Sequence, residues 1–166
     1  NLNGWLISAV LIAGLALWFR PVVLPWLAGQ AVIGICLLEM ANYVQHYGLR
    51  RQLLPNGRYE RIGPQHSWNC NYLITNVFLF HLQRHSDHHA NPQRRFAYLR
   101  GVELAPQLPA GYATMFLLAA VPPLWRRVMD PRVINYYDGR IDRAAVHPRR
   151  KKTLLRKHSD RQVVNL

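Results

Sequence analysis

Two long apolar runs occupy the first forty residues of the chain. Residues 1–19 contain no acidic, basic or histidine side chain, and after Arg20 the run 21–38 contains none either. Each run approaches the roughly 20 apolar residues that a helix needs to cross a hydrocarbon core of about 30 Å. Neither has the basic segment and small-residue cleavage site of a signal peptide. The pattern therefore predicts two membrane-spanning helices rather than a signal peptide followed by a core helix.

The connection between the two runs is short. Arg20 and Pro21 mark the break, because proline lacks the backbone donor and clashes with the preceding helical turn. The two runs are thus expected to form a helical hairpin. Its two outer ends then lie on one side of the membrane.

The second helix is expected to continue beyond its apolar part. Glu39, Asn42 and His46 follow at spacings of three and four, so they form one polar stripe along the helix. Gly48 is a plausible stop for that helix. The hairpin is therefore predicted to span residues 1–48.

Residues 49–147 contain shorter apolar segments. Ser67 is a candidate N-cap for a helix through residues 68–90, whose apolar centre is too short to cross a bilayer. Residues 111–127 are apolar but interrupted by two prolines, and we expect an interfacial or partly buried helix there. Its expected residues at the water boundary are Trp125, Arg126 and Arg127.

The charge of the chain indicates its orientation. The formal net charge is +13, and Arg20 is the one basic residue before position 50. Cytoplasmic segments beside membrane spans carry such an excess, so the part after Gly48 is expected in the cytoplasm. Residues 148–166 read as a polybasic tail that an anionic leaflet would attract by about 1 kcal/mol per basic residue. Nucleic-acid binding, the usual alternative for a basic chain, does not fit one that begins with a membrane hairpin.

The segment HLQRHSDHHA, residues 81–90, contains four of the eight histidines. His88 and His89 follow His85 at i+3 and i+4, which places the three imidazoles on one helical face. Neutral imidazole suits iron, zinc, copper or nickel. The alternative is a polar helix end that contains histidines by chance. Ligating histidines need a partner for the other ring nitrogen, and the candidates are Asn76, Gln83 and Asp87. His81 is expected to be a further outer partner or a core histidine rather than a ligand.

His46 lies where the second span is expected to emerge from the membrane. Glu39 is two turns below it on the same stripe, and a carboxylate at that depth is costly unless it is paired or functional. One interpretation makes His46 a ligand that Glu39 and Asn42 support. In the other, Glu39 only bonds a neighbouring helix. Together the elements predict an all-α, membrane-embedded bundle fragment, with two transmembrane helices and a histidine-bearing helical region at the cytoplasmic face.

Six motifs resemble, in the same order, the C-terminal part of the integral-membrane alkane 1-monooxygenases. They are NYVQHYGL, GRYER, HSWNCN, HLQRHSDHHANPQRR, LPAGYATM and PPLWRRVMDPRV, and the resemblance runs from about Leu37 to about His147. It implies a non-haem di-iron enzyme of the bacterial inner membrane, with six membrane helices and its histidine ligands on the cytoplasmic side. Such enzymes hydroxylate the terminal carbon of n-alkanes with O2 and electrons from rubredoxin.

The resemblance also implies a ligand set. His85, His88 and His89 match the third histidine box of the family, and His46 matches the ligand of its HYG box. The other histidines outside residues 81–90 match no family ligand: His66, His147 and His158. The first two boxes, HExxH and EHxxGHH, are absent, so the chain is interpreted as a C-terminal fragment. The remaining ligands of the two irons are then expected upstream, and the fragment alone is expected to be inactive.

Two positions depart from the family pattern within its motifs. Gln45 stands where glutamate usually precedes the HYG histidine, and Cys70 stands where a hydroxyl is common. An acidic electron donor is expected to dock on the basic cytoplasmic side. Candidate docking residues are Arg50, Arg51, Arg58, Arg61, Arg94, Arg95, Arg126 and Arg127. Two alternatives remain: another membrane di-iron enzyme acting on xylene or fatty-acyl substrates, and a zinc-binding membrane anchor.

Overall fold

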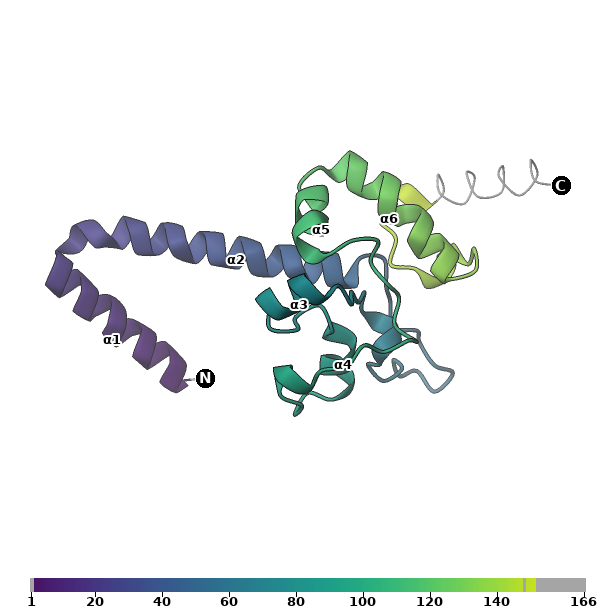
Figure 1. The fold of residues 1–166 in the computed structure, drawn as a ribbon, viewed down its shortest axis with the longest axis horizontal. Coiled ribbons are helices and arrows are strands. Elements are labelled where there is room, and N and C mark those ends of the chain that lie inside the picture. Colours follow the sequence, from purple (N-terminus) through teal and green to yellow (C-terminus); the bar gives the residue numbers. More distant parts are fainter. Residues whose placement is uncertain (1, 148, 152–166) are drawn as a thin grey trace. The chain divides into compact units, whose positions relative to one another are not determined.

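The computed structural model describes residues 2–147 and 149–151, so most of the predicted polybasic tail, with His158, lies outside the described residues. The α-helices are α1 (Leu2–Phe19), α2 (Leu24–His46), α3 (Leu73–Phe78), α4 (His85–Ala90), α5 (Tyr112–Ala119) and α6 (Pro122–Tyr136) (Figure 1). The 3-10 helices are η1 (Pro21–Val23), η2 (Pro64–His66), η3 (Phe96–Tyr98) and η4 (Ile141–Arg143). Within the described ranges β-structure is limited to isolated bridges. The predicted all-α class is confirmed.

Helices α1 and α2 confirm the prediction of two long apolar helices. Both are long and apolar enough to cross a membrane, with a mean hydropathy of 1.9 over 18-residue windows. Their apolar side chains face outward: 86% of Leu17 and 82% of Trp18 is exposed. Such a surface is unfavourable in water and is matched by a lipid environment. Arg20, with φ 66°, and η1 form the short connection between the two helices.

The chain divides into two compact units, one ending at Ala41 and one beginning at Asn42. The boundary therefore precedes the last turn of α2, whereas the sequence placed it after residue 48. Val44 and Gln45 in that turn are buried, with exposed fractions of 0% and 1%. The Gln45 carbonyl accepts a hydrogen bond of 2.7 Å from the backbone N–H of Trp68. The last turn of α2 thus belongs to the core of the second unit.

Helices α5 and α6 form much of that core. Tyr112, Met115 and Ala119 are buried along α5 at spacings of three and four, as expected for one face of a helix. The buried residues of α6 repeat every four positions: Trp125, Met129 and Val133. The predicted position of Trp125 at the water boundary is wrong. The indole is fully buried and lies against the rings of Tyr43 and Tyr47, with centroid distances of 5.3 and 5.2 Å.

The predicted continuous helix over residues 68–90 is also wrong. Carbonyl groups at its expected start accept other donors: Asn69 O accepts the Leu108 N–H at 2.8 Å, and Cys70 O accepts the Asn76 side-chain amide at 2.9 Å. These carbonyls therefore do not enter an α-helical ladder. Ser67 is accordingly in an extended conformation and does not cap α3.

A second interruption separates α3 from α4. Phe80 and His81 have φ values of 49° and 59°, in the left-handed region, which no right-handed helix can continue through. The His81 N–H donates instead to the carbonyl of Asn76 at 2.8 Å. As a result α4 is a separate short helix that carries His85, His88 and His89 on its own.

Candidate metal centre

His46 is the last residue of α2, and its ring orientation is defined by a backbone contact. The Nδ1 atom lies 2.9 Å from the carbonyl oxygen of His66. Because a carbonyl oxygen can only accept, Nδ1 must carry the proton, and in the neutral ring the lone pair is then on Nε2. This is the tautomer in which Nε2 binds a metal and Nδ1–H bonds an outer partner.

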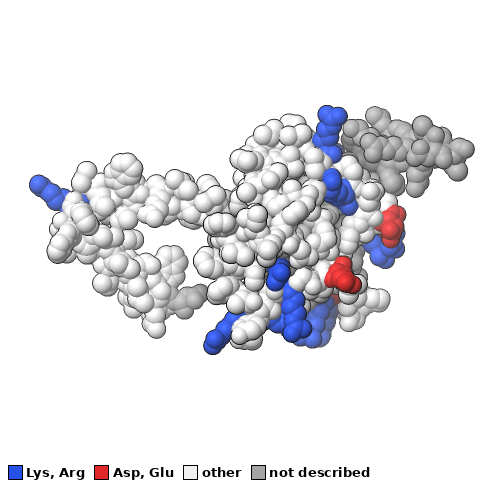
Figure 2. All heavy atoms as spheres, in the orientation of Figure 1, with Lys and Arg blue, Asp and Glu red and all other residues white. Residues whose placement is uncertain are grey.

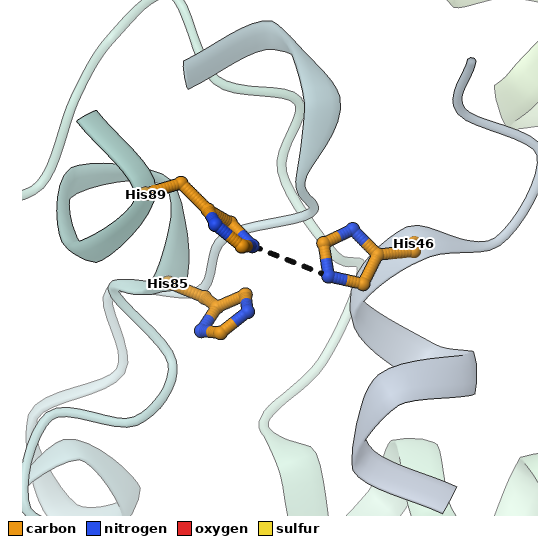
Figure 3. Close-up of side chains that lie close together, drawn as sticks. All are labelled: His46, His85 and His89. Carbon is orange, nitrogen blue, oxygen red and sulfur yellow. Dashed lines mark hydrogen bonds between the residues drawn. The ribbon is translucent and has the colours of Figure 1, made fainter. Parts of the chain in front are cut away.

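His85 and His89 bring their rings to the same place from α4. The ligand nitrogens of His46, His85 and His89 all lie within 4.8 Å of one another (Figure 3). The Nε2 atoms of His46 and His89 are 3.4 Å apart, and the ring centroids of His85 and His89 are 4.3 Å apart. His88 is exposed and outside this trio, with its ring centroid 5.7 Å from that of His85.

The spacing between His46 and His89 fits a bound metal ion. Two imidazole nitrogens at about 2.0–2.1 Å from one ion are separated by about 2.9–3.4 Å for right-angled to tetrahedral coordination. The observed 3.4 Å between His46 Nε2 and His89 Nε2 falls at the upper end of that interval. The three imidazoles are therefore candidates for part of a coordination shell, in the ligand type that iron and zinc share.

Burial favours the neutral form of two α4 imidazoles, His85 and His89. Desolvation, with smaller contributions from the neighbouring His89, His46 and His88, lowers the pKa of His85 from 6.5 to about 3. Desolvation and the nearby imidazoles of His46 and His88 lower the pKa of His89 as well. Since only the neutral ring can donate a lone pair to a metal, both shifts favour the ligating form.

The Asp87 carboxylate bonds the segment that follows α4. Although Asp87 is between two ligand candidates in sequence, its carboxylate accepts hydrogen bonds from Arg94, Asn91 and the backbone N–H of Arg100. Burial alone would raise the pKa of Asp87, but these donors and the Arg94 charge lower it overall. Asp87 therefore holds the segment 91–100 onto α4 and bonds none of the histidines in the described chain.

Asn76 and His81 are likewise directed away from the trio. The buried Asn76 amide donates to the carbonyls of Cys70 and Tyr72, at 2.9 and 3.0 Å. The His81 Nδ1 bonds the carbonyl of Phe96 at 3.0 Å. Both residues thus support the backbone of the turns around α3, and within the described chain neither bonds a histidine of the trio.

Glu39 and Asn42 are exposed on α2. Within residues 2–147 and 149–151 neither side chain makes a hydrogen bond to a histidine of the trio. Asn42 lines a cavity of about 630 Å³ that also reaches His46. Support of His46 by Glu39 remains an expectation from the polar stripe.

The outer partner of His46 is His66, a residue that the sequence analysis left without a role. It is buried, 7% exposed, and its Nε2 lies 2.9 Å from the Glu60 carboxylate. The contact to His46 uses the backbone carbonyl of His66, so no side-chain pattern in the sequence indicates it.

The two departures from the family motifs are both in the core. Gln45 and Cys70 are each 1% exposed. Burial, partly offset by a backbone hydrogen bond, raises the pKa of the Cys70 thiol, which therefore stays neutral. The Gln45 side chain is fully buried one residue before His46, on a different side of α2, as expected from the 100° rotation per residue.

The arginines proposed for docking fall into distinct settings. Figure 2 shows basic groups spread over the second unit with few acidic ones between them. Arg50 and Arg51 line an open cavity of about 490 Å³ together with His46 and His89. Arg94 is paired with Asp87 at 2.6 Å and is not a free docking charge. Arg58, Arg61, Arg95 and Arg127 are exposed, and Arg126 is half-buried beside the larger cavity.

Two apolar spans and an imidazole trio define a helical membrane protein with a candidate metal centre. The family model described as fatty acid desaturase matches residues 2–119, which covers both spans and all four histidine candidates. The chain belongs to the fatty acid desaturase family. That family implies non-haem iron, and the trio fits it.

Three curated relatives illustrate the similarity. "Alkane 1-monooxygenase 2" of Pseudomonas aeruginosa is 57% identical over 133 residues, 80% of this chain and 35% of the relative. "Alkane 1-monooxygenase" of Acinetobacter baylyi is 47% identical over 156 residues, 94% of this chain and 38% of the relative. The hydroxylase component of xylene/toluene monooxygenase from Pseudomonas putida is 33% identical over 109 residues, 66% of this chain and 28% of the relative. The chain thus spans roughly a third of the length of these relatives.

Proposed function

We propose that the chain is the C-terminal part of a non-haem di-iron membrane monooxygenase that hydroxylates the terminal carbon of n-alkanes. One observation carries the proposal: imidazoles from α2 and α4, 43 residues apart, converge within 3.4 Å, in a chain whose close relatives are alkane 1-monooxygenases. The i, i+4 spacing on α4 alone explains why His85 and His89 lie close together. It does not explain why His46 lies beside them.

The proposed metal ligands are His46, His85, His88 and His89. The trio consists of His46, His85 and His89. The exposed ring of His88 lies beside His85 and is proposed to bind the second ion. Bound iron would supply the activation of O2. The chain itself supplies neutral imidazoles, a fixed ring orientation at His46 and a partly buried setting.

Four imidazoles are too few for two iron ions. We therefore propose that further ligands come from other parts of the whole protein, of which this chain matches roughly a third. The 166-residue polypeptide alone is then expected to hold iron weakly and to have no hydroxylase activity. Tightly held, stoichiometric di-iron in that polypeptide would contradict this.

The proposed location is the bacterial inner membrane, with several spans and the C-terminus in the cytoplasm. The exposed apolar surfaces of α1 and α2 support lipid contact, and the excess of basic residues after Gly48 supports a cytoplasmic second unit. An n-alkane partitions into lipid, so it would reach the enzyme from the bilayer. Its recognition must depend on shape, because an alkane has no hydrogen-bonding group.

Rubredoxin is the proposed electron donor, and the cavity lined by Arg50 and Arg51 is its most favourable docking position. That cavity also contains His46 and His89, so a donor there would be close to the ligands. Positive charge around the opening would accelerate association with an acidic protein. Arg58, Arg61, Arg95, Arg126 and Arg127 are proposed as secondary contributors.

A second candidate is hydroxylation of an aromatic methyl group, which the similarity to the xylene/toluene monooxygenase component favours. The higher identity to alkane 1-monooxygenases favours alkanes. A fatty-acyl substrate and a redox-silent zinc anchor are further alternatives, because imidazole binds zinc equally well.

The deciding experiment compares octane, xylene and a fatty-acyl substrate with the full-length enzyme, O2 and a reduced donor. We expect 1-octanol as the main product, bound iron, and no product from His46→Ala. Preferred oxidation of xylene or of the fatty-acyl substrate would identify that compound, rather than an alkane, as the substrate class. Bound zinc without O2 consumption would overturn the oxygenase proposal.

A further inference from the structure

We propose that the segment His66–Trp68 is a positioning clamp that fixes the imidazole of His46, and that Glu60 holds this clamp through the His66 ring. The inference rests on the proposed function, because it takes His46 to be a metal ligand. It adds residues that make no contact with the metal but determine where one ligand points. Neither Glu60 nor Trp68 is among the candidate ligands or outer partners identified from the sequence.

The clamp contacts three consecutive residues at the end of α2. The Trp68 N–H donates to Gln45 O at 2.7 Å, and the Trp68 indole Nε1–H donates to Tyr47 O at 2.8 Å. Between these two contacts, the His46 Nδ1–H donates to His66 O at 2.9 Å. The residues before and after the ligand are thus fixed as well as the ligand ring itself.

These contacts stabilise the C-terminal end of α2, where His46 lies. Carbonyl groups in the last turn of a helix have no partner within the helix, and helix ends fray. A ligand in that turn would be held poorly by the helix alone. The clamp satisfies two of those carbonyls and selects the His46 tautomer with a free Nε2.

The His66 ring is itself held on both sides. Its Nδ1 accepts the Gly63 N–H at 3.0 Å, so Nε2 carries the proton that is donated to the Glu60 carboxylate at 2.9 Å. The same Glu60 oxygen accepts the Gln52 N–H at 2.8 Å. Glu60 therefore ties the ring to the loop at residues 52–60. Movement of the ring would move the backbone carbonyl that bonds His46.

The first test measures how firmly iron is held in the full-length protein. Fe(II)-loaded protein is mixed with a ferrous chelator, and the rate of iron release is followed. We expect His66→Ala to release iron about tenfold faster or more, within the range of about 10- to 100-fold that loss of an outer partner typically costs. His81→Ala is the matched control, because its Nδ1 also bonds a backbone carbonyl but outside the centre. It should release iron at the parent rate.

The second test separates positioning from general stability by means of Glu60. Glu60→Gln keeps an oxygen that can accept from His66 and Gln52, and it should retain the parent release rate and the parent visible spectrum of Co(II)-substituted protein. Glu60→Ala removes that oxygen, and it should accelerate release and change the Co(II) spectrum. Unfolding temperatures of the metal-free variants show whether the change exceeds a loss of stability.

The outcomes are distinguishable. Release at the parent rate and an unchanged Co(II) spectrum in both His66→Ala and Glu60→Ala would overturn the clamp and leave the proposed function intact. If His66→Ala does not fold, the Glu60 pair decides, and equal behaviour of Glu60→Gln and Glu60→Ala overturns the inference. A parent protein that binds no iron would overturn the proposed function and this inference with it.

Discussion

The Nε2 atoms of His46 and His89 lie 3.4 Å apart, although 43 residues separate them in the chain. The last turn of α2 packs into the second unit, and a separate short helix, α4, presents His89 to it. Without a metal, two imidazole nitrogens at this distance gain at most one hydrogen bond. The shared cation of the proposed metal centre would account for the convergence.

Removal of either imidazole of this pair should weaken metal binding. Loss of an outer partner of a ligand typically lowers metal affinity by about 10- to 100-fold. Loss of a ligand itself should cost at least as much, so we expect a decrease of that size or larger in iron affinity for His46→Ala and His89→Ala. Iron content of the purified full-length variants measures the effect. His81→Ala, which alters a histidine outside the centre, should keep the iron content of the parent. Equal iron in all three variants would show that the trio is not the metal site.

The pH dependence of the metal-free protein should report on His85. Its pKa falls from 6.5 in the unfolded chain to about 3 in the fold. Below pH 6.5 the unfolded chain therefore binds a proton that the folded chain excludes, so stability is full above that pH and is lost as pH falls towards 3. One such proton contributes a slope of up to about 1.4 kcal/mol per pH unit.

The measurement is the free energy of unfolding between pH 7 and pH 4. His85→Gln removes the titrating group, so its stability should decline less steeply than that of the parent over this interval. His147→Gln is the control for loss of a histidine outside the trio. A parent and a His85→Gln variant with the same slope would contradict the predicted burial of a neutral imidazole.

The pair Asp87–Arg94 should matter for stability. The Asp87 carboxylate is 3% exposed and accepts from Arg94 at 2.6 Å and from the Arg100 N–H at 2.8 Å. Asp87→Asn removes the charge and part of the acceptor capacity, and we expect a loss of about 2 kcal/mol, as for other hydrogen bonds to charged groups. Asp138→Asn is the control, since Asp138 is 85% exposed and its nearest Arg140 nitrogen is 4.0 Å away. Thermal or denaturant unfolding compares the two, and equal effects would contradict the prediction.

Local patterns in the sequence were sufficient for the spans and for the approach of His85 and His89. The apolar runs of α1 and α2 are properties of composition, and residues at i and i+4 lie together on any helix. His88, predicted on the same face, is exposed and outside the trio. The inclusion of His46 in the set depended on the resemblance to a known family. No local pattern brings residue 46 to residue 89.

What the sequence did not indicate depends on backbone contacts between distant segments. The helix predicted over residues 68–90 fails because Asn69 and Cys70 use their backbone groups elsewhere. The bond from His46 to His66 ends on a carbonyl oxygen, which every residue type has. Asp87 was predicted to be an outer partner of the histidines because it lies between them in sequence. Its carboxylate instead accepts hydrogen bonds from three residues of the following segment.

Donor docking should depend on the arginines beside the cavity. Arg50 and Arg51 line the opening that reaches His46 and His89, so Arg50→Glu/Arg51→Glu should raise the KM for the reduced donor and leave the iron content unchanged. Arg132→Glu is the control, because Arg132 is exposed, does not line this cavity and is not among the proposed docking residues. The rise in KM should diminish at high salt, because screening removes long-range attraction. Unchanged donor kinetics in the double variant would exclude this face.

Gly48 should be the most sensitive glycine near the centre. Its φ is 72°, and a Cβ there would lie 2.5 Å from Val133 Cγ2 on α6. Gly48→Ala therefore combines left-handed strain, about 1–3 kcal/mol, with a clash that pushes the end of α2 away from α6. His46 lies two residues earlier and would shift, so we expect lower stability and faster iron release.

Gly57→Ala separates the backbone strain from the clash, because Gly57 has φ 75° and no atom within 4 Å of the new Cβ. Gly57→Ala should lose only the stability that the backbone strain costs, and it should keep the parent rate of iron release. Adding Val133→Ala to Gly48→Ala should remove the clash and restore part of the lost stability. Equal losses at positions 48 and 57, with no rescue, would show that contact with α6 does not position His46.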